Sequence, residues 1–155
     1  MIAHSLLISS ETQLEKIALE IAEKLQQGDT ITLRGDLGAG KTTFTRFLIN
    51  SLFNKSIEVQ SPTFTLVHEY VSPKGKIWHY DLYRLKDKRE IRELLLLDFL
   101  EKDICIIEWP EIIEEYLPEN RLDIYLDYME DNLESRIVKF VTHGSWLERI
   151  KDVSK

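Results

Sequence analysis

The residues best suited to chemistry form one short segment, residues 35–43, with the sequence Gly-Asp-Leu-Gly-Ala-Gly-Lys-Thr-Thr. Its three glycines allow the backbone to turn sharply, so that N–H groups can approach an anion closely. Lys41 adds a mobile positive charge, and the Thr42 hydroxyl is an oxygen ligand for Mg²⁺. The spacing fulfils the G-x-x-x-x-G-K-[ST] motif of phosphate-binding loops, and we call this segment the glycine loop. We therefore expect nucleotide binding, with ATP or ADP and Mg²⁺ as ligands.

An apolar run with Ile31 and Leu33 precedes the glycine loop, and a helical pattern follows it to about Phe53. This is the strand, loop and helix context that the motif requires. The helix would direct its N-terminus, with unpaired N–H groups, at the same anion. The residues expected to bind the nucleotide are Asp36, Leu37, Gly38, Ala39, Gly40, Lys41, Thr42 and Thr43.

Glu108 is the strongest candidate outside the glycine loop. It ends the continuous apolar run 104–107, which is typical of a parallel strand covered on both faces. An acid at the carboxyl end of such a strand can hold Mg²⁺ opposite the loop hydroxyl, in the Walker B arrangement. The alternative is a surface acid that merely follows a strand, and the glycine loop favours the magnesium role. We predict Thr42 and Glu108 as metal ligands, and Lys41 and Glu108 as catalytic residues.

Asp81 lies near the end of a predicted strand over residues 77–83. Alternation places it on the same strand face as His79. From spacing alone two roles stay open, because Asp81 could orient water or the metal, or could pair with Arg84. The hydroxyls of residues 61–65 could sense a γ-phosphate, although their composition favours a turn.

The remaining patterns predict an α/β fold of the P-loop NTPase class. We expect a central, mostly parallel sheet flanked by helices, with antiparallel hairpin additions, in a single ATPase domain over residues 1–155. The expected elements are a helix capped by Ser10, a hairpin of 66–71 with 77–83, helices over 88–100 and 110–116, and a hairpin of 122–128 with 136–141 across 130–134.

Composition narrows the function classes. The net charge of −7 disfavours direct binding of nucleic acid, which usually requires a basic surface. No apolar run approaches the roughly twenty residues of a membrane span, so no membrane association is expected. A single cysteine, Cys105, suits a reducing compartment, and we expect a cytoplasmic protein. The histidines lack the spacing of a zinc site.

Four blocks of the chain, residues 35–44, 61–67, 79–85 and 107–110, resemble the TsaE family. These are small bacterial ATPases of tRNA threonylcarbamoyladenosine synthesis. The resemblance implies Mg²⁺-dependent ATP hydrolysis that is weak in isolation and a complex with the TsaB–TsaD pair. In that scheme TsaD modifies the adenosine beside the anticodon. The ATPase does not carry the transferred group, and it meets tRNA only indirectly through the complex.

Carried over by position, Lys41 corresponds to a phosphate contact, and Thr42 and Glu108 to the magnesium ligands. Asp81 corresponds to an acid needed for hydrolysis, which favours a catalytic role over the Arg84 pair. Two regions depart from the family pattern. The stretch 94–97 is Leu-Leu-Leu-Leu where relatives commonly carry a glycine, and the tail after residue 130 diverges. These departures concern local contacts rather than the expected ATP site.

Two other functions remain open from the residues. The glycine loop also fits the tighter G-x-x-G-x-G-K-[ST] pattern of small-molecule kinases, and Arg84, Arg89 and Arg92 could close over transferring phosphates. The hairpin that follows the loop helix argues against that alternative, because kinases usually build a helical acceptor region there. A third hypothesis is a nucleotide sensor that binds ATP without hydrolysing it.

Overall fold

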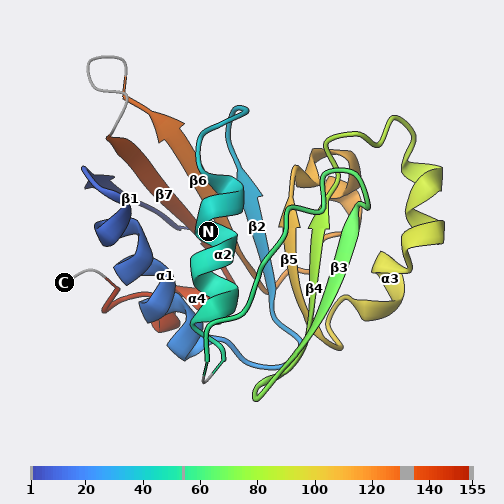
Figure 1. Ribbon diagram of the computed structural model, residues 1–155, viewed down its shortest axis with the longest axis horizontal. Coiled ribbons are helices and arrows are strands. Elements are labelled where there is room, and N and C mark those ends of the chain that lie inside the picture. The colour runs from blue at the N-terminus through green and yellow to red at the C-terminus, as the bar shows by residue number, and fades with distance from the viewer. Residues whose placement is uncertain (1, 54, 130–134, 154–155) are drawn as a thin grey trace.

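The computed structural model describes residues 2–53, 55–129 and 135–153. The fold is built around a single seven-stranded sheet (Figure 1). In chain order the elements are β1 (Ile2–Ile8), α1 (Glu11–Lys24), β2 (Thr30–Arg34), α2 (Lys41–Asn50), β3 (Val67–Ser72), β4 (Gly75–Asp81), the 3-10 helix η1 (Lys88–Leu94), α3 (Leu96–Phe99), β5 (Ile104–Glu108), the 3-10 helix η2 (Pro110–Tyr116), β6 (Arg121–Tyr128), β7 (Arg136–His143) and α4 (Trp146–Arg149). The predicted α/β fold with one helix-flanked sheet is confirmed. None of the helices within these ranges has the length and apolar character needed to cross a bilayer.

The strand order is β1-β7-β6-β2-β5-β4-β3. The four central strands, β6, β2, β5 and β4, pair in parallel, and antiparallel pairs flank them. The predicted hairpins are present as β3–β4 and β6–β7, while the turn expected at 130–134 lies outside the described residues. The parallel register places Leu33 beside Glu108, and Glu108 beside Asp81, at one edge of the sheet. Ligands of open α/β sheets bind at this edge, beyond the carboxyl ends of the strands.

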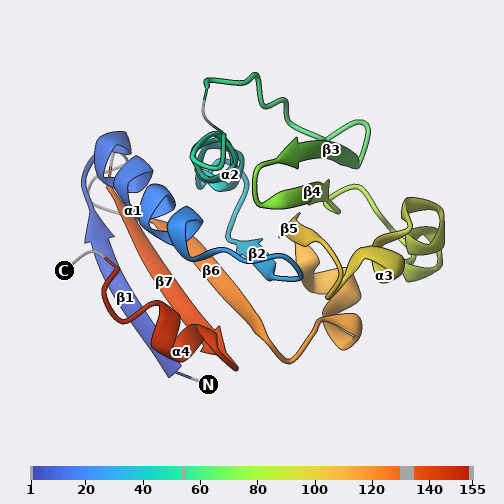
Figure 2. The ribbon, with the colours of Figure 1, turned by 90° about the horizontal axis from the view of Figure 1, so that it is seen from below.

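The apolar run of β5 is covered on both faces, as predicted. Ile104 and Ile106 join a large buried cluster with side chains of α1, α2 and α4, and Figure 2 shows α1 and α2 on one side of the sheet. Cys105 and Ile107 join a second cluster with side chains of η1, α3 and η2. Because β5 is packed from both sides, the position of Glu108 at its end is held firmly.

A buried polar cluster anchors the end of β2, directly before the glycine loop. Arg34 pairs with Glu114 of η2 at 2.8 Å, and its Nε donates to Thr32 Oγ1 at 3.1 Å. Thr32 in turn donates to Asp123 of β6 at 2.5 Å, and Arg121 also donates to that carboxylate at 3.1 Å. Burial raises the pKa of Asp123, but the Thr32 hydrogen bond and the two guanidinium groups outweigh it and lower the pKa. The strand end that leads into the loop is therefore fixed by charged partners from two other elements.

The predicted single helix over 88–100 is wrong. The segment instead forms η1 and α3, which are separated at Leu95 with φ of +56° and ψ of 17°. This turn allows both Ile91 and Leu96 to pack into the second cluster, where both are buried. A left-handed non-glycine residue costs about 1–2 kcal/mol, which the burial of two large aliphatic side chains offsets.

Both ends of α1 have specific partners. Its start is capped by the Ser10 side chain, as predicted. At the other end, Lys74 reaches over from the β3–β4 turn. Its Nζ donates to the carbonyl oxygens of Ala22, Glu23 and Leu25 at 2.9, 2.9 and 3.0 Å. The ammonium thus adds a charged donor to carbonyl groups at the C-terminal end of α1 and complements the negative end of the helix dipole.

We predict that Lys74→Met lowers the free energy of unfolding by about 1–2 kcal/mol, because three carbonyl groups lose a charged donor. Urea titration monitored by circular dichroism measures the change. Lys76→Met is the matched control, since Lys76 lies on the same hairpin and makes only an exposed 3.7 Å pair with Glu69. That control should stay within about 0.5 kcal/mol of the wild type. Equal effects of the two substitutions would contradict a capping role for Lys74.

Candidate functional site

The glycine loop joins β2 to α2, and its backbone requires glycine at specific positions. Gly35 and Gly38 have φ of +136° and +77°, which side chains rarely allow. A Cβ at Gly35 would overlap the carbonyl oxygen of Leu126, and one at Gly38 would approach the Tyr128 hydroxyl to 2.7 Å. Gly40 is the N-cap of α2 and provides no side-chain cap. The first N–H groups of α2 are therefore left for another acceptor, as in anion-binding helix ends.

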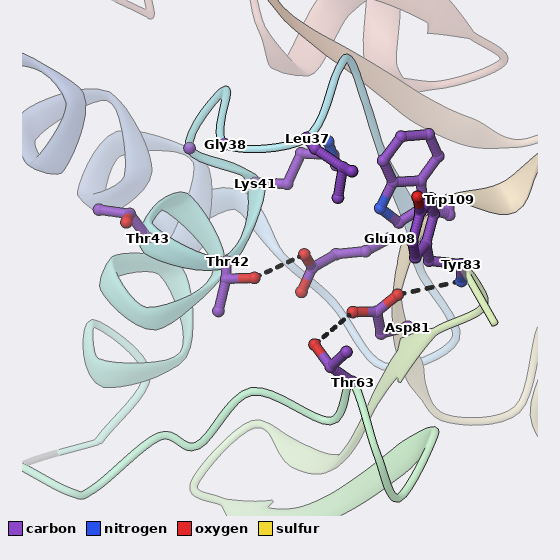
Figure 3. Close-up of a pocket in the computed structure, with 11 residues that line it drawn as sticks. Leu37, Gly38, Lys41, Thr42, Thr43, Thr63, Asp81, Tyr83, Glu108 and Trp109 are labelled. Carbon is purple, nitrogen blue, oxygen red and sulfur yellow. Dashed lines mark hydrogen bonds between the residues drawn. The ribbon is translucent and has the colours of Figure 1, made fainter.

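A cavity of about 210 Å³ opens between this loop and the carboxyl ends of β4 and β5. Figure 3 shows Thr42 and Thr63 directed toward two acidic side chains, Glu108 and Asp81. The lining residues are Leu37, Gly38, Gly40, Lys41, Thr42, Thr43, Thr63, Asp81, Tyr83, Glu108 and Trp109. Residues from the loop, from the segment after α2 and from two strand ends thus meet in one cavity.

Lys41 is folded back onto the loop that carries it. Its Nζ donates to the carbonyl oxygens of Gly35 and Asp36 at 2.5 and 2.6 Å. The same atom lies 4.2 Å from the ring centroid of Trp109, a cation–π contact. Burial lowers the pKa of Lys41, and the negative charge of nearby carboxylates, led by Glu108, opposes this shift. The ammonium is satisfied within the chain, yet it borders the cavity.

Glu108 is almost fully buried and uses both oxygens. Its Oε1 accepts a hydrogen bond from Thr42 Oγ1 at 2.8 Å, and its Oε2 lies 2.5 Å from His79 Nε2. The structure therefore brings the two predicted metal ligands together. A hydroxyl and a carboxylate oxygen suit Mg²⁺, which usually completes its octahedron with substrate phosphates and water. Within the described ranges, no three His, Cys, Asp or Glu side chains form a metal-binding group.

Asp81 is buried beside Glu108 and is held by two donors. Its Oδ2 accepts from Thr63 Oγ1 at 3.0 Å, and its Oδ1 accepts from the Tyr83 N–H at 3.1 Å. Burial raises the pKa of Asp81, and the hydrogen bond from Tyr83 opposes that shift. The guanidinium of Arg84 lies over the Phe64 ring at 5.1 Å. Asp81 thus takes its hydrogen bonds from Thr63 and Tyr83 and faces the cavity.

The family model for "Threonylcarbamoyl adenosine biosynthesis protein TsaE" matches residues 8–138. The chain belongs to the TsaE family. The tRNA threonylcarbamoyladenosine biosynthesis protein TsaE of Rickettsia felis is 36% identical to this chain over 140 residues. The match covers 90% of this chain and 81% of the Rickettsia protein. In Bacillus subtilis the identity is 38% over 135 residues, with 86% and 82% covered.

A solved structure shares the same architecture. Bacillus subtilis YdiB superposes with a TM-score of 0.73 at 30% identity, covering 99% of this chain and 95% of that one. The similarity covers nearly the whole chain, so it includes the C-terminal hairpin of β6 and β7. The TsaE resemblance carried by the four motif blocks is thereby confirmed for the family and for the fold.

Two of the predicted nucleotide-binding residues of this TsaE chain lie outside the main cavity. Ala39 lines a neighbouring pocket of about 230 Å³, which shares Gly38, Gly40 and Thr43 with the first. Asp36 lines neither of the two and contributes its carbonyl oxygen to Lys41. The second pocket is completed by Ile8, Ser10, Glu11, Leu14 and Arg136. The start of α1 and the start of β7 thus reach the glycine loop.

Four residues that the sequence did not single out contact the site of this TsaE protein. His79 contacts Glu108, and the Trp109 ring contacts Lys41. Tyr128 donates to the Gly38 carbonyl, and Arg136 Nε donates to the Ala39 carbonyl at 3.2 Å. Trp109 follows Glu108 directly, and His79 shares a strand face with Asp81, so those signals were present. The other two depend on the pairing of β6 with β2, which local patterns do not reveal.

We predict that Asp81→Asn stabilises the protein at neutral pH. Burial raises the native pKa of Asp81 above its unfolded value near 3.9, so the native state keeps this proton to a higher pH than the unfolded state does. The wild type therefore loses stability as pH rises from the unfolded pKa through the native pKa. An amide avoids this cost: its oxygen can accept from the Tyr83 N–H, and its NH2 can donate to Thr63 Oγ1, which reverses the direction of that bond. The stability difference between variant and wild type should be absent below the unfolded pKa and grow with increasing pH. Urea titrations at several pH values measure it, with the exposed Asp127→Asn as control; a pH-independent difference would contradict the prediction.

Proposed function

We propose that this TsaE protein is a Mg²⁺-dependent ATPase of the P-loop NTPase class, forming one domain over residues 1–155. One observation carries the proposal. The glycine loop presents Lys41 and Thr42 at the N-terminus of α2, and Thr42 is hydrogen-bonded to the buried carboxylate of Glu108 at 2.8 Å. A backbone cradle, a cation, a hydroxyl and an acid are the groups that phosphoryl-transfer proteins of this class combine.

The phosphate chain of ATP would lie along the glycine loop. Loop N–H groups and the first turn of α2 donate to its oxygens, and Lys41 exchanges its two carbonyl partners for the β- and γ-phosphates. Thr42 and Glu108 would hold Mg²⁺, which offsets phosphate charge when bound. We assign the nucleoside to the second pocket, because it adjoins the first across Gly40 and Thr43.

Asp81 is the group we assign to the attacking water. Hydrolysis forms a bond from the water oxygen to the γ-phosphorus and breaks the bond to the β–γ bridging oxygen, giving ADP and inorganic phosphate. The carboxylate orients that water by accepting a hydrogen bond from it, and burial makes it a better proton acceptor than an exposed aspartate. In the chain alone its oxygens are already engaged by Thr63 and Tyr83. This supports slow hydrolysis alone and activation by a partner that moves the segment around Thr63.

The biological role we propose is the modification of tRNA with threonylcarbamoyladenosine at the adenosine next to the anticodon. The relatives named above are biosynthesis proteins of this modification. The chain would act by hydrolysing ATP within a complex with TsaB and TsaD homologues, without carrying the transferred group. The net charge of −7 supports contact with tRNA only through that complex. A cytoplasmic location follows from this role.

The structure gives less support to a small-molecule kinase. The described lining of the main cavity contains no arginine. Arg89 pairs with Asp87 at 2.6 Å, and Arg84 lies over the Phe64 ring. The β3–β4 hairpin occupies the position after α2 where a kinase builds a helical acceptor region. These contacts favour hydrolysis over transfer to a small molecule.

We predict that Glu108→Ala lowers Mg²⁺-dependent ATP turnover at least about 100-fold while much of the nucleotide affinity remains, because the loop and Lys41 are intact. Lys41→Ala should instead lose nucleotide affinity. Phosphate release and calorimetry with ADP measure the two effects, and the exposed Glu119→Ala serves as control. Unimpaired Mg²⁺-dependent hydrolysis by the Glu108 variant would overturn its assignment. ATP binding and tRNA modification that survive the loss of hydrolysis would favour the sensor alternative.

Reconstitution tests the proposed role directly. We predict that TsaB and TsaD homologues from the same organism raise ATP turnover by this chain, and that repeated rounds of tRNA modification require it. Modified nucleoside and released phosphate are measured in parallel, with Glu108→Ala as the inactive control. ADP formation that depends on a small-molecule acceptor, without any effect of the two partners, would support the kinase instead.

A further inference from the structure

The second oxygen of Glu108 has its own buried partner. His79 Nε2 lies 2.5 Å from Glu108 Oε2, and the two side chains are 0% and 2% exposed. The other oxygen, Oε1, accepts from Thr42. Glu108 therefore stands between two elements, with one oxygen directed to α2 and the other to β4.

The imidazole has one hydrogen bond within the described chain, and it goes to Glu108. In the tautomer that carries the proton on Nε2, this nitrogen donates to the Glu108 oxygen. Nδ1 is buried and has no hydrogen-bond partner among the described residues. In the sheet His79 is paired with Ile106 of β5, and Ile77 lies two residues earlier on the same face of β4. A leucine at this position would avoid the cost of the unpaired Nδ1, but it would leave the buried Oε2 of Glu108 without this donor, so the histidine serves the carboxylate rather than the packing around it.

We propose that His79 is a positioning residue that holds the Glu108 carboxylate in place for a divalent ion. The inference rests on the proposed ATPase function. A Thr42 oxygen that ligates a metal through a lone pair can still donate its O–H to Glu108 Oε1, so Oε1 would be shared between the hydroxyl and the metal. The bond from His79 holds the other oxygen, Oε2, on the β4 side and leaves Oε1 directed at the cavity. Partners behind metal ligands commonly fix ligand orientation, and losing one costs about 10–100-fold in metal affinity or activity.

The test measures metal binding without turnover. Mn²⁺ is titrated into the protein saturated with the non-hydrolysable analogue AMP-PNP, and free Mn²⁺ is followed by electron paramagnetic resonance. His79→Leu should weaken Mn²⁺ binding about 10–100-fold, while AMP-PNP affinity measured in EDTA stays near the wild-type value. His79→Gln, whose amide can reach the position of Nε2, should restore most of the Mn²⁺ affinity. His79→Asn, with a shorter side chain, should not.

Tyr80→Phe is the matched structural control. Tyr80 is the next residue on β4, and it is also buried. Its hydroxyl donates to the Leu94 carbonyl at 2.9 Å, away from the site. The substitution should lower stability and leave Mn²⁺ affinity unchanged. If His79→Leu does not fold, the comparison of His79→Gln with His79→Asn decides the same question.

Wild-type Mn²⁺ affinity in the folded His79→Leu variant, or equal affinities in the Gln and Asn variants, would overturn the inference. In that case Glu108→Ala still loses Mn²⁺ binding, and the proposed function stands. If the wild type itself gains no AMP-PNP affinity from Mn²⁺, and Glu108→Ala changes nothing, the proposed function fails and the inference fails with it. The Glu108 variant therefore separates the two failures.

Discussion

The burial of one carboxylate, that of Glu108, constrains the whole site. A buried carboxylate needs hydrogen-bond donors, and this one has Thr42 from α2 and His79 from β4. Each donor reaches it only if the glycine loop, α2 and the β4–β5 pair are correctly placed. The register that sets Leu33 and Asp81 beside Glu108 supplies that placement. Apolar clusters on both faces of β5 then prevent the strand end from shifting.

The site is satisfied within the chain before any ligand binds. Lys41 is bonded to two loop carbonyl groups, and Asp81 is bonded to Thr63 and to the Tyr83 N–H. Phosphate or water must replace these partners, so the free energy of binding is reduced by what the closed arrangement already provides. This offers a physical reason why such an ATPase would be slow alone. A partner that moved the segment around Thr63 would release Asp81 without touching the glycine loop.

Contiguous patterns predicted most of the fold and the loop side of the site. The glycine loop, the strand that ends at Glu108 and the β3–β4 hairpin are encoded within short windows, where composition and periodicity act directly. The strand face that His79 shares with Asp81 was visible in the sequence, but its contact with Glu108 depends on the parallel register of two strands that lie apart in sequence. The interruption at Leu95 was missed for a related reason. Helical spacing was present, but packing of its neighbours against β4 and β5 decided the backbone.

The C-terminal hairpin is another part of the structure whose contacts with the site were not predicted from the sequence. From the sequence, the tail after residue 130 was expected to depart from the family pattern without affecting the ATP site, whereas the family model matches the chain as far as residue 138. In the structure Tyr128 donates to the carbonyl of Gly38, and Arg136 lies over the Tyr128 ring at 4.1 Å while bonding to the Ala39 carbonyl. The C-terminal end of β6 and the N-terminal end of β7 thus hold residues 38 and 39 of the glycine loop. Because the carbonyl groups of Gly38 and Ala39 are held from outside the loop, a substitution in this hairpin can change the conformation of the glycine loop without altering the motif itself.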